Sequence, residues 1–245
     1  MTAHLAHIWR HPIKGIGAEA LEQVTLGAGT PLPGDRAWAL RHEGAAAHED
    51  WQPRRNFLVT AYGPALAAVT ARTEADGRLT LCHPARPDLS FAPETEGTAL
   101  IDWVRPLWPA QHSAPAHFFA APPQGMADNG MAQVSIMNLS SLRALSQRVG
   151  AKLDMRRFRG NLWLDGLAPW EEFDLIGRMI RIGDTRLEIT DRIDRCRATE
   201  ANPETGQRDV DPCRALLDGY GHKDFGVYAT VITGGAVSVG AEVTL

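Results

Sequence analysis

Glycine and proline interrupt the apolar segments of this chain so often that few of these segments can form a helix. The 245 residues include 23 glycines and 16 prolines. The apolar runs between them in the first half are short, which favours strands over helices. Strands are predicted over residues 4–9, 20–26, 36–41, 56–61, 66–73, 78–82 and 115–120. We therefore expect a mainly β (α+β) fold with few helices.

Turn residues connect several of the predicted strands. Ala75-Asp76-Gly77 lies between two strand segments and suits a β-hairpin. Gly183-Asp184 and Gly234-Gly235 suit two-residue turns and predict two more hairpins. Their paired strands are expected at 178–182 with 185–190, and at 226–233 with 236–243.

Two segments have helical character. Residues 98–108 predict one helix, which the proline within them would end or kink. The apolar residues of 139–149 repeat at spacings of three and four. We expect a helix there, with Ser140 or Ser141 as the N-cap and Gly150 as its end.

Residues 121–130 (APPQGMADNG) form the densest cluster of Pro, Gly and Asn in the chain. We place a domain boundary in this cluster, which gives two barrel-like domains over residues 1–121 and 122–245. Residues 191–225 are mostly polar and irregular, and a long loop of that kind on a strand scaffold commonly carries a functional site.

Composition excludes several classes of protein. The 25 Lys and Arg against 29 Asp and Glu give a formal charge of −4, which argues against a nucleic-acid or anionic-membrane binder that acts through a general positive field. Three cysteines form no disulfide framework, so a reduced compartment, the cytoplasm, is expected. No apolar run approaches the ~20 residues of a membrane helix, and no signal-peptide pattern opens the chain.

Cys196 lies between Arg195 and Arg197. Guanidinium charge favours a thiolate, which is both a nucleophile and a soft metal ligand. Composition alone favours the alternative, a small buried hydrophobe. No His and acid partners at fixed spacing accompany Cys196, so a metal or cofactor ligand is the more economical functional interpretation. A zinc set with Cys213 and His222 would have gaps of 17 and 9 residues, which match no standard ligand spacing.

Four polar residues are candidates for binding an anion. Residues 157–164 alternate with a period of two, which predicts a strand with Arg159 and Asn161 on one face. Lys14 and Arg36 lie beside turn residues. Convergence of Lys14, Arg36 and Arg159 on one phosphate would suit guanidinium geometry, whereas solvated surface positions are the alternative. The chain contains no P-loop, GxGxxG, HExxH or GxSxG motif.

Seven segments together resemble the MOSC proteins, which are named for the C-terminal domain of molybdenum cofactor sulfurase. The segments are WRHPIKG (9–15), LPGDRAWAL (32–40), NLSSLRAL (138–145), RFRGNLWLDGLAPWEEF (157–173), IGRMIRIG (176–183), DRCRATEANPETGQRD (194–209) and FGVYA (225–229). They extend over nearly the whole chain. The similarity is greatest to the two-part group that includes the mitochondrial amidoxime-reducing component and its bacterial relatives.

This resemblance implies a MOSC N-terminal β-barrel domain packed on a MOSC domain, with a pterin molybdenum cofactor at the junction. It implies that Cys196 ligates molybdenum and is the catalytic residue. It also implies cofactor-binding roles for seven further residues: Lys14, Arg36, Arg159, Asn161, Arg195, Thr199 and Tyr228. Two positions depart from the family pattern, because Gly15 replaces a common serine and Gly160 replaces a proline.

The resemblance further implies an oxidoreductase that reduces small N-hydroxylated or N-oxide-type substrates. The chain has no ferredoxin-like cysteine set, so electrons are expected from a separate ferredoxin- or flavin-type reductase. We expect neither nucleic acid nor membrane as a partner. Two alternatives stay open: a non-catalytic carrier of molybdenum cofactor or sulfur that uses Cys196, and a hydrolase with Cys196 as nucleophile and His222 as base.

Overall fold

The computed structural model describes residues 3–46, 48 and 50–245. The strands are β1 (Ala3–Arg10), β2 (Glu19–Leu21), β3 (Gln23–Leu26), β4 (Trp38–His42), β5 (Thr70–Thr73), β6 (Leu79–His83), β7 (Arg86–Phe91), β8 (Pro115–Ala120), β9 (Val134–Asn138), β10 (Leu162–Asp165), β11 (Met179–Ile182), β12 (Thr185–Asp194), β13 (Asp224–Thr233), β14 (Gly235–Ser238) and β15 (Glu242–Thr244). The α-helices are α1 (Gly97–Val104), α2 (Leu139–Val149) and α3 (Pro212–Tyr220). The short 3-10 helices are η1 (Arg54–Asn56), η2 (Pro64–Ala68), η3 (Arg105–Leu107), η4 (Met155–Phe158), η5 (Glu171–Leu175) and η6 (Arg197–Glu200).

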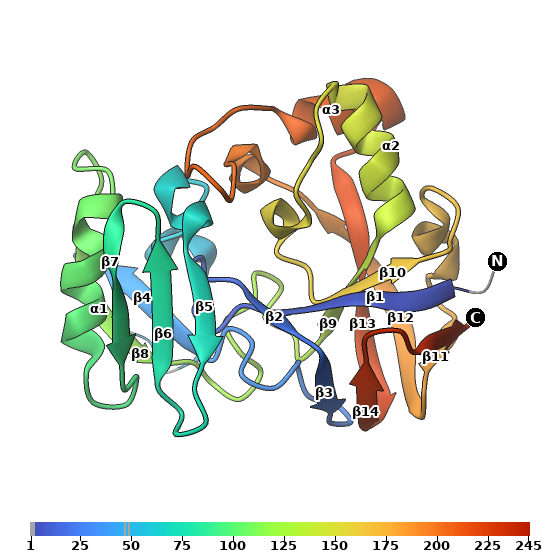
Figure 1. The fold of residues 1–245 in the computed structure, drawn as a ribbon, viewed down its shortest axis with the longest axis horizontal. Helices are drawn as coiled ribbons and strands as arrows, with labels where there is room; N and C mark the ends of the chain where they lie inside the picture. Colours follow the sequence, from blue (N-terminus) through green and yellow to red (C-terminus); the bar gives the residue numbers. More distant parts are fainter. Residues whose placement is uncertain (1–2, 47, 49) are drawn as a thin grey trace.

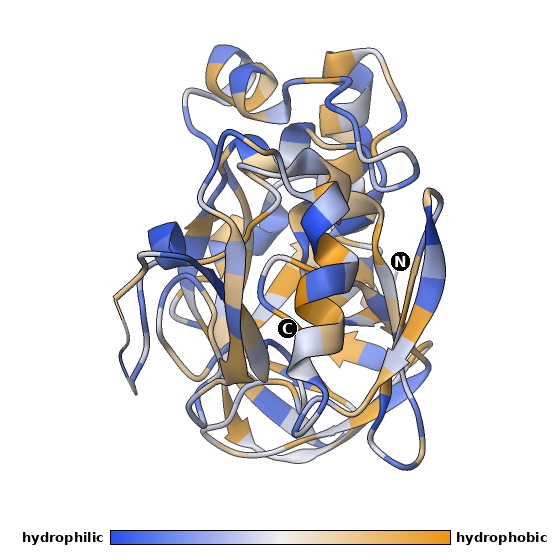
Figure 2. Ribbon diagram, turned by 90° about the vertical axis from the view of Figure 1, so that its left-hand side faces the viewer, coloured by the Kyte–Doolittle hydropathy of each residue, from blue (hydrophilic) through white to orange (hydrophobic). Residues whose placement is uncertain are grey.

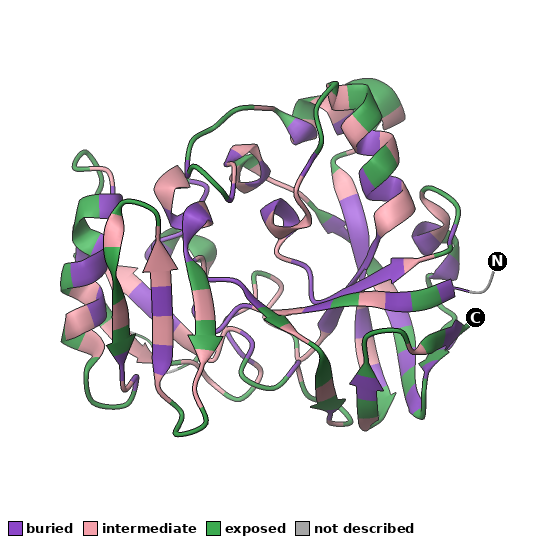
Figure 3. Ribbon diagram, viewed as in Figure 1, coloured by how far each residue is buried: buried purple, intermediate pink, exposed green. Residues whose placement is uncertain are grey.

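A closed seven-stranded barrel forms one half of the molecule (Figure 1). Its strand order is β10-β9-β13-β12-β11-β15-β1, and pairing of β1 with β10 closes it. Residues alternate in burial along its strands, as in β12, where Leu187 and Ile189 are buried and Arg186 and Glu188 are exposed (Figures 2 and 3). The inward apolar residues make one continuous core, which fixes the register of the strands.

The other half consists of two smaller sheets and α1. One sheet pairs β4 with β8, and the second has the order β5-β6-β7. Helix α1 packs against β7 and β8, and a second apolar core lies between these elements.

No helix within the described ranges is long and apolar enough to span a bilayer. The expected mainly β fold with few helices is confirmed.

Several predicted elements are correct. The β5–β6 and β11–β12 hairpins form as expected. The helix at 98–108 is α1, followed by the 3-10 turn η3 at its proline. Gly150 ends α2 in the left-handed conformation, with φ 76°. The boundary at residue 121 stays a prediction, and β1 and β3, which precede it, pair with strands that follow it.

Other predicted strands are wrong. The strand at 56–61 is absent, because η1 and a series of turns occupy this region and only Phe57 forms a bridge, with Arg41. The strand at 20–26 is split into β2 and β3, and the first part of 66–73 lies in η2. The hairpin at Gly234-Gly235 is also wrong, because β14 pairs with β3 rather than with β13. This pairing aligns Val237 with Val24 and buries Val237 in the barrel core.

Three local predictions in the second half are wrong. Asn138, not Ser140 or Ser141, caps α2, because its side chain accepts from the Ser140 backbone amide. The polar stretch 191–225 contains α3, for which an Asp211 cap and a following proline are standard start signals. The strand at 157–164 begins only at Leu162, after η4.

Candidate functional site

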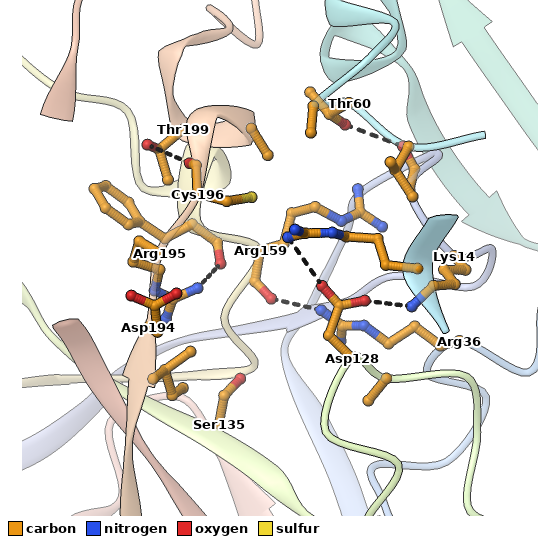
Figure 4. A pocket seen from close by; sticks show the side chains of 18 of the residues that line it. Lys14, Arg36, Thr60, Asp128, Ser135, Arg159, Asp194, Arg195, Cys196 and Thr199 are labelled. Atoms are coloured by element: carbon orange, nitrogen blue, oxygen red, sulfur yellow. Dashed lines mark hydrogen bonds and ion pairs between the residues drawn. The ribbon is translucent and has the colours of Figure 1, made fainter. Parts of the chain in front are cut away.

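One pocket, of about 160 Å³, lies between the barrel and the smaller sheets (Figure 4). All eight residues that the sequence singled out line it: Lys14, Arg36, Arg159, Asn161, Arg195, Cys196, Thr199 and Tyr228. They come from the segment after β1, the segment before β4, the segment before β10, the loop after β12 and, for Tyr228, from β13 itself. The structure thus places these residues in one site, and their individual roles stay predictions.

Cys196 lies two residues after the end of β12, at the N-cap of η6. Its side chain is half-buried, and its sulfur points into the pocket (Figure 4). The buried hydroxyl of Thr199 donates to the Cys196 carbonyl at 3.1 Å, which fixes the backbone at the cysteine. The same hydroxyl lies 3.6 Å from the sulfur of Cys213. The thiol is therefore presented to the pocket from an anchored turn.

Arg195 is held by three backbone carbonyl bonds. Its guanidinium donates twice to Phe225 O and once to Phe158 O, at 2.6 to 2.8 Å. Burial lowers the pKa of Arg195 to about 10, so it remains charged at neutral pH. Among the described residues its guanidinium forms no ion pair with a carboxylate. Arg195 therefore contributes a fixed positive charge to the pocket wall.

Arg159 reaches the pocket from an unusual backbone conformation. It adopts φ 48° directly after η4, so it does not lie on a strand face as predicted. Its guanidinium donates to Gly17 O at 3.0 Å and to Ile13 O at 3.1 Å. Burial, together with the nearby charge of Arg36, lowers the pKa of Arg159 to about 9. Within the described part of the chain Arg159, like Arg195, has no carboxylate partner.

Arg36 adopts the same left-handed conformation, with φ 50°. Its guanidinium donates to the Arg159 carbonyl at 2.8 Å and pairs with Asp35. Three non-glycine residues in the described ranges have positive φ, and Arg36 and Arg159 are two of them. Such conformations cost on the order of 1–3 kcal/mol each and cluster at functional sites.

Asp35 and His11 form a buried pair behind Arg36. Asp35 Oδ1 accepts from the His11 backbone amide at 2.7 Å. Burial, reinforced by Arg159, lowers the pKa of His11 to about 3, so this imidazole is neutral at physiological pH. Burial alone would raise the pKa of Asp35, but the charge of Arg36 and the hydrogen bonds of His11 and Arg36 together outweigh it and hold this pKa below its usual value. Asp35 therefore stays ionised and orients Arg36.

Lys14 follows β1, and its side chain is only 4% exposed. Its ammonium donates to Met126 O at 2.7 Å and to Asp128 Oδ1 at 2.5 Å. Burial lowers the pKa of Lys14, and Asp128 opposes this effect. The other oxygen of Asp128 lies 3.8 Å from Arg54. Lys14 thus lies on the side of the pocket opposite Cys196 (Figure 4).

Asn161 and Tyr228 reach the pocket from the barrel side. Asn161 Oδ1 accepts from the amide and hydroxyl of Ser135, and its Nδ2 donates to Trp9 O at 3.2 Å. These bonds join β1, β9 and the start of β10, so Asn161 shapes the pocket floor through the backbone. Tyr228 faces the pocket from β13, and burial raises the pKa of its phenol.

Arg157 was not predicted, yet it organises the loop that follows Cys196. Its side chain is 3% exposed. One terminal nitrogen donates to Thr199 O and Glu200 O, and the other donates to both oxygens of Asp209 at 2.7 and 2.8 Å. These four hydrogen bonds, called here the Arg157 fork, connect η6 to Asp209 at the other end of the loop and so position the turn that carries Cys196.

Further polar pocket residues were missed, among them Arg54, Thr60, Asp128 and Asp194. Asp128 lies in the cluster at 121–130, which was interpreted only as a boundary, although polar loop residues on a rigid scaffold commonly carry function. His222, the base of the hydrolase hypothesis, does not line this pocket. It packs instead against Trp170, Phe173 and Tyr220.

The pocket has an excess of positive groups. Its lining contains six cationic side chains, of Lys14, Arg36, Arg54, Arg157, Arg159 and Arg195, and three carboxylates, of Asp35, Asp128 and Asp194. Two of the arginines have no carboxylate partner in the described part of the chain. This excess of positive charge beside the Cys196 thiol suits an anionic ligand that carries a soft metal or a sulfur-reactive group.

Family models account for nearly the whole chain. A model described as the MOSC domain matches residues 112–244, and one described as the MOSC N-terminal beta barrel domain matches residues 2–117. The chain belongs to the MOSC family. The resemblance inferred from the motifs is thereby confirmed.

A curated relative of this MOSC protein is the molybdenum cofactor sulfurase of Anopheles gambiae, 31% identical over 115 residues. The match covers 42% of this chain and 15% of the relative, so the chain spans only a small part of that protein. A solved YUAD protein from Bacillus subtilis aligns over 99% of this chain and 94% of its own, at 13% identity and a TM-score of 0.49. YiiM from Geobacillus stearothermophilus aligns over 46% of this chain and 53% of its own, at 18% identity and a TM-score of 0.35.

Proposed function

We propose that this MOSC protein binds a molybdenum cofactor in the pocket and acts as an oxidoreductase on small N-hydroxylated or N-oxide-type substrates. One observation carries the proposal. The thiol of Cys196 faces the same pocket as the guanidinium groups of Arg159 and Arg195, which have no carboxylate partner among the described residues. A thiolate is a soft metal ligand, and fixed guanidinium charge suits the phosphate of a pterin cofactor.

The residues present fit such a group. Cys196 would be the protein's ligand to the metal, while Lys14, Arg36 and Arg159 would hold the phosphate end. Arg195 and Tyr228 would line the space nearer the cysteine, and Thr199 would keep its backbone in place. When bound, the cofactor would supply the electron-transfer chemistry that removes oxygen from the substrate.

The chain's own residues bind and orient rather than react. The carbonyl bonds of Arg195 and Arg159 hold their charges still, so little reorganisation is needed when an anion enters. The Arg157 fork holds the turn that carries the thiol. Electrons would come from a separate ferredoxin- or flavin-type reductase, and a reduced, cytoplasmic setting suits a ligand thiol that must not be oxidised.

The test is the molybdenum and pterin content of protein made in a host that produces the cofactor. Wild type is compared with Cys196→Ser and with a matched control, Cys82→Ser, since Cys82 lies on β6 and does not line the pocket. We expect near-stoichiometric molybdenum in wild type and Cys82→Ser and clearly less in Cys196→Ser. With a reductase, a small amidoxime should be reduced by the first two proteins only. Full activity in Cys196→Ser would refute the proposal.

A carrier of molybdenum cofactor or sulfur is the second candidate. The name of the matched relative, a molybdenum cofactor sulfurase, and the closeness of the Cys213 sulfur to Thr199 beside Cys196 favour it. A carrier would release its cofactor to an apoenzyme and reduce no substrate with any reductase. Measured transfer without turnover would select this candidate over the first.

A further inference from the structure

Asp128 is unlike the other carboxylates of the pocket. Asp35 is buried and bonded to both His11 and Arg36, so it belongs to the scaffold. The side chain of Asp128 is 51% exposed, yet it pairs with Lys14, which is 4% exposed. Its second oxygen faces Arg54 at 3.8 Å. One carboxylate thus lies between two cations of the pocket, where a ligand oxyanion would find the same partners (Figure 4).

Lys14 has no other anionic partner in the described part of the chain. Its other hydrogen bond goes to the neutral carbonyl of Met126. A phosphate group that pairs with Lys14 must therefore share it with Asp128 or displace Asp128. Sharing would place two anions against one buried ammonium, and like charges at such distances repel strongly in a partly desolvated site.

We propose that Asp128 occupies the anion-binding position beside Lys14 and Arg54 and that a phosphate-type oxyanion enters the pocket by displacing it. Asp128 then sets which ligands the pocket accepts, because only a group more strongly anionic than one carboxylate gains from the exchange. The inference rests on the proposed function only in taking the ligand to be anionic.

The segment that carries Asp128 contacts a tryptophan that can report the displacement. Trp51 donates from its indole nitrogen to Ala127 O at 2.6 Å, directly beside Asp128. Gly130 packs against the same indole ring. Movement of Asp128 away from Lys14 would therefore alter the surroundings of Trp51.

The experiment titrates inorganic pyrophosphate into cofactor-free full-length protein by calorimetry. Asp128→Asn removes the competing charge while keeping the shape, and we expect about three- to fivefold tighter binding than in wild type, as for loss of a partly exposed ion pair. Asp194→Asn is the matched control, since Asp194 lines the same pocket and changes the net charge equally, but it pairs with Lys223 at 3.7 Å. Its affinity should change by less than about twofold.

Tryptophan emission gives the second readout. Pyrophosphate should shift the emission of wild type, and Trp51→Phe should remove that shift while it leaves binding measurable by calorimetry. The inference is overturned if Asp128→Asn binds pyrophosphate no more tightly than wild type, if both Asn variants tighten equally, or if no variant binds it. The two proposals can fail separately. If the affinities follow the expected order but the protein never takes up molybdenum, the displacement is supported and the proposed function is contradicted.

Discussion

Replacing Arg157 by methionine should destabilise the protein far more than losing an ordinary surface arginine. Methionine keeps most of the buried aliphatic packing but removes the four hydrogen bonds that Arg157 makes. Glu200 O still accepts from the Asp209 amide and Asp209 still accepts from the Asn202 side chain, but Thr199 O has no other hydrogen-bond donor among the described residues. The loss is therefore not compensated at the turn that carries Cys196.

The expected magnitude follows from the burial of the pair. Breaking a buried ion pair costs about 3–5 kcal/mol. Asp209 is 38% exposed, so water solvates part of the charge left behind, and we expect about 3 kcal/mol. With a urea dependence of about 2–3 kcal/mol per molar, the unfolding midpoint should fall by roughly 1 M.

The matched control is Arg214→Met. Arg214 pairs with Asp218 four residues later on α3, and its side chain is 69% exposed. Exposed helix pairs of this kind contribute about 0.3–0.5 kcal/mol. Urea unfolding followed by circular dichroism compares the two variants with wild type. Equal midpoints for Arg157→Met and Arg214→Met would show that the fork does not hold the loop.

Two further predictions concern glycine geometry and a buried carboxyl. Gly226 has φ 77°, and an added Cβ would lie 2.5 Å from Met137 Sδ and 2.8 Å from Ile136 O, so Gly226→Ala should cost about 3 kcal/mol in thermal unfolding. Gly240→Ala, with similar φ but open space, should cost only about 1 kcal/mol, and equal losses would contradict the steric argument. Burial raises the pKa of Glu172 above its unfolded value, so its contribution to stability is full at low pH and is lost as pH rises through the folded pKa. Wild type should therefore lose stability relative to Glu172→Gln between pH 4.5 and 8, and a constant difference across this range would refute the assignment.

The eight site residues were predicted from short motifs, and the structure brings them to one pocket, while their roles stay predictions. Their local structure was less predictable. The alternation at 157–164 suggested a strand, but Arg159 takes a left-handed conformation that carbonyls of Gly17 and Ile13 stabilise from far along the chain. Periodicity contains no information about such distant partners.

Pairing between distant strands was the other limit. Gly234-Gly235 indicates a turn, but the partner of β14 is β3, near the opposite end of the chain. Helix α3 was predictable from Asp211, Pro212 and Gly221, which mark its ends, and was missed because its polar composition resembles a loop. Asp128 was hidden for a similar reason, since its Pro- and Gly-rich surroundings also describe a connection between domains.

Absorption spectroscopy at the molybdenum edge tests the central claim most directly, because it counts the sulfur atoms bound to the metal. Protein from a cofactor-producing host should contain molybdenum, and Cys196→Ser should show one sulfur neighbour fewer at the metal than wild type while its fold is unchanged. Wild-type protein without molybdenum, or an unchanged sulfur count in the variant, would contradict the assignment of Cys196 as the metal ligand of this pocket.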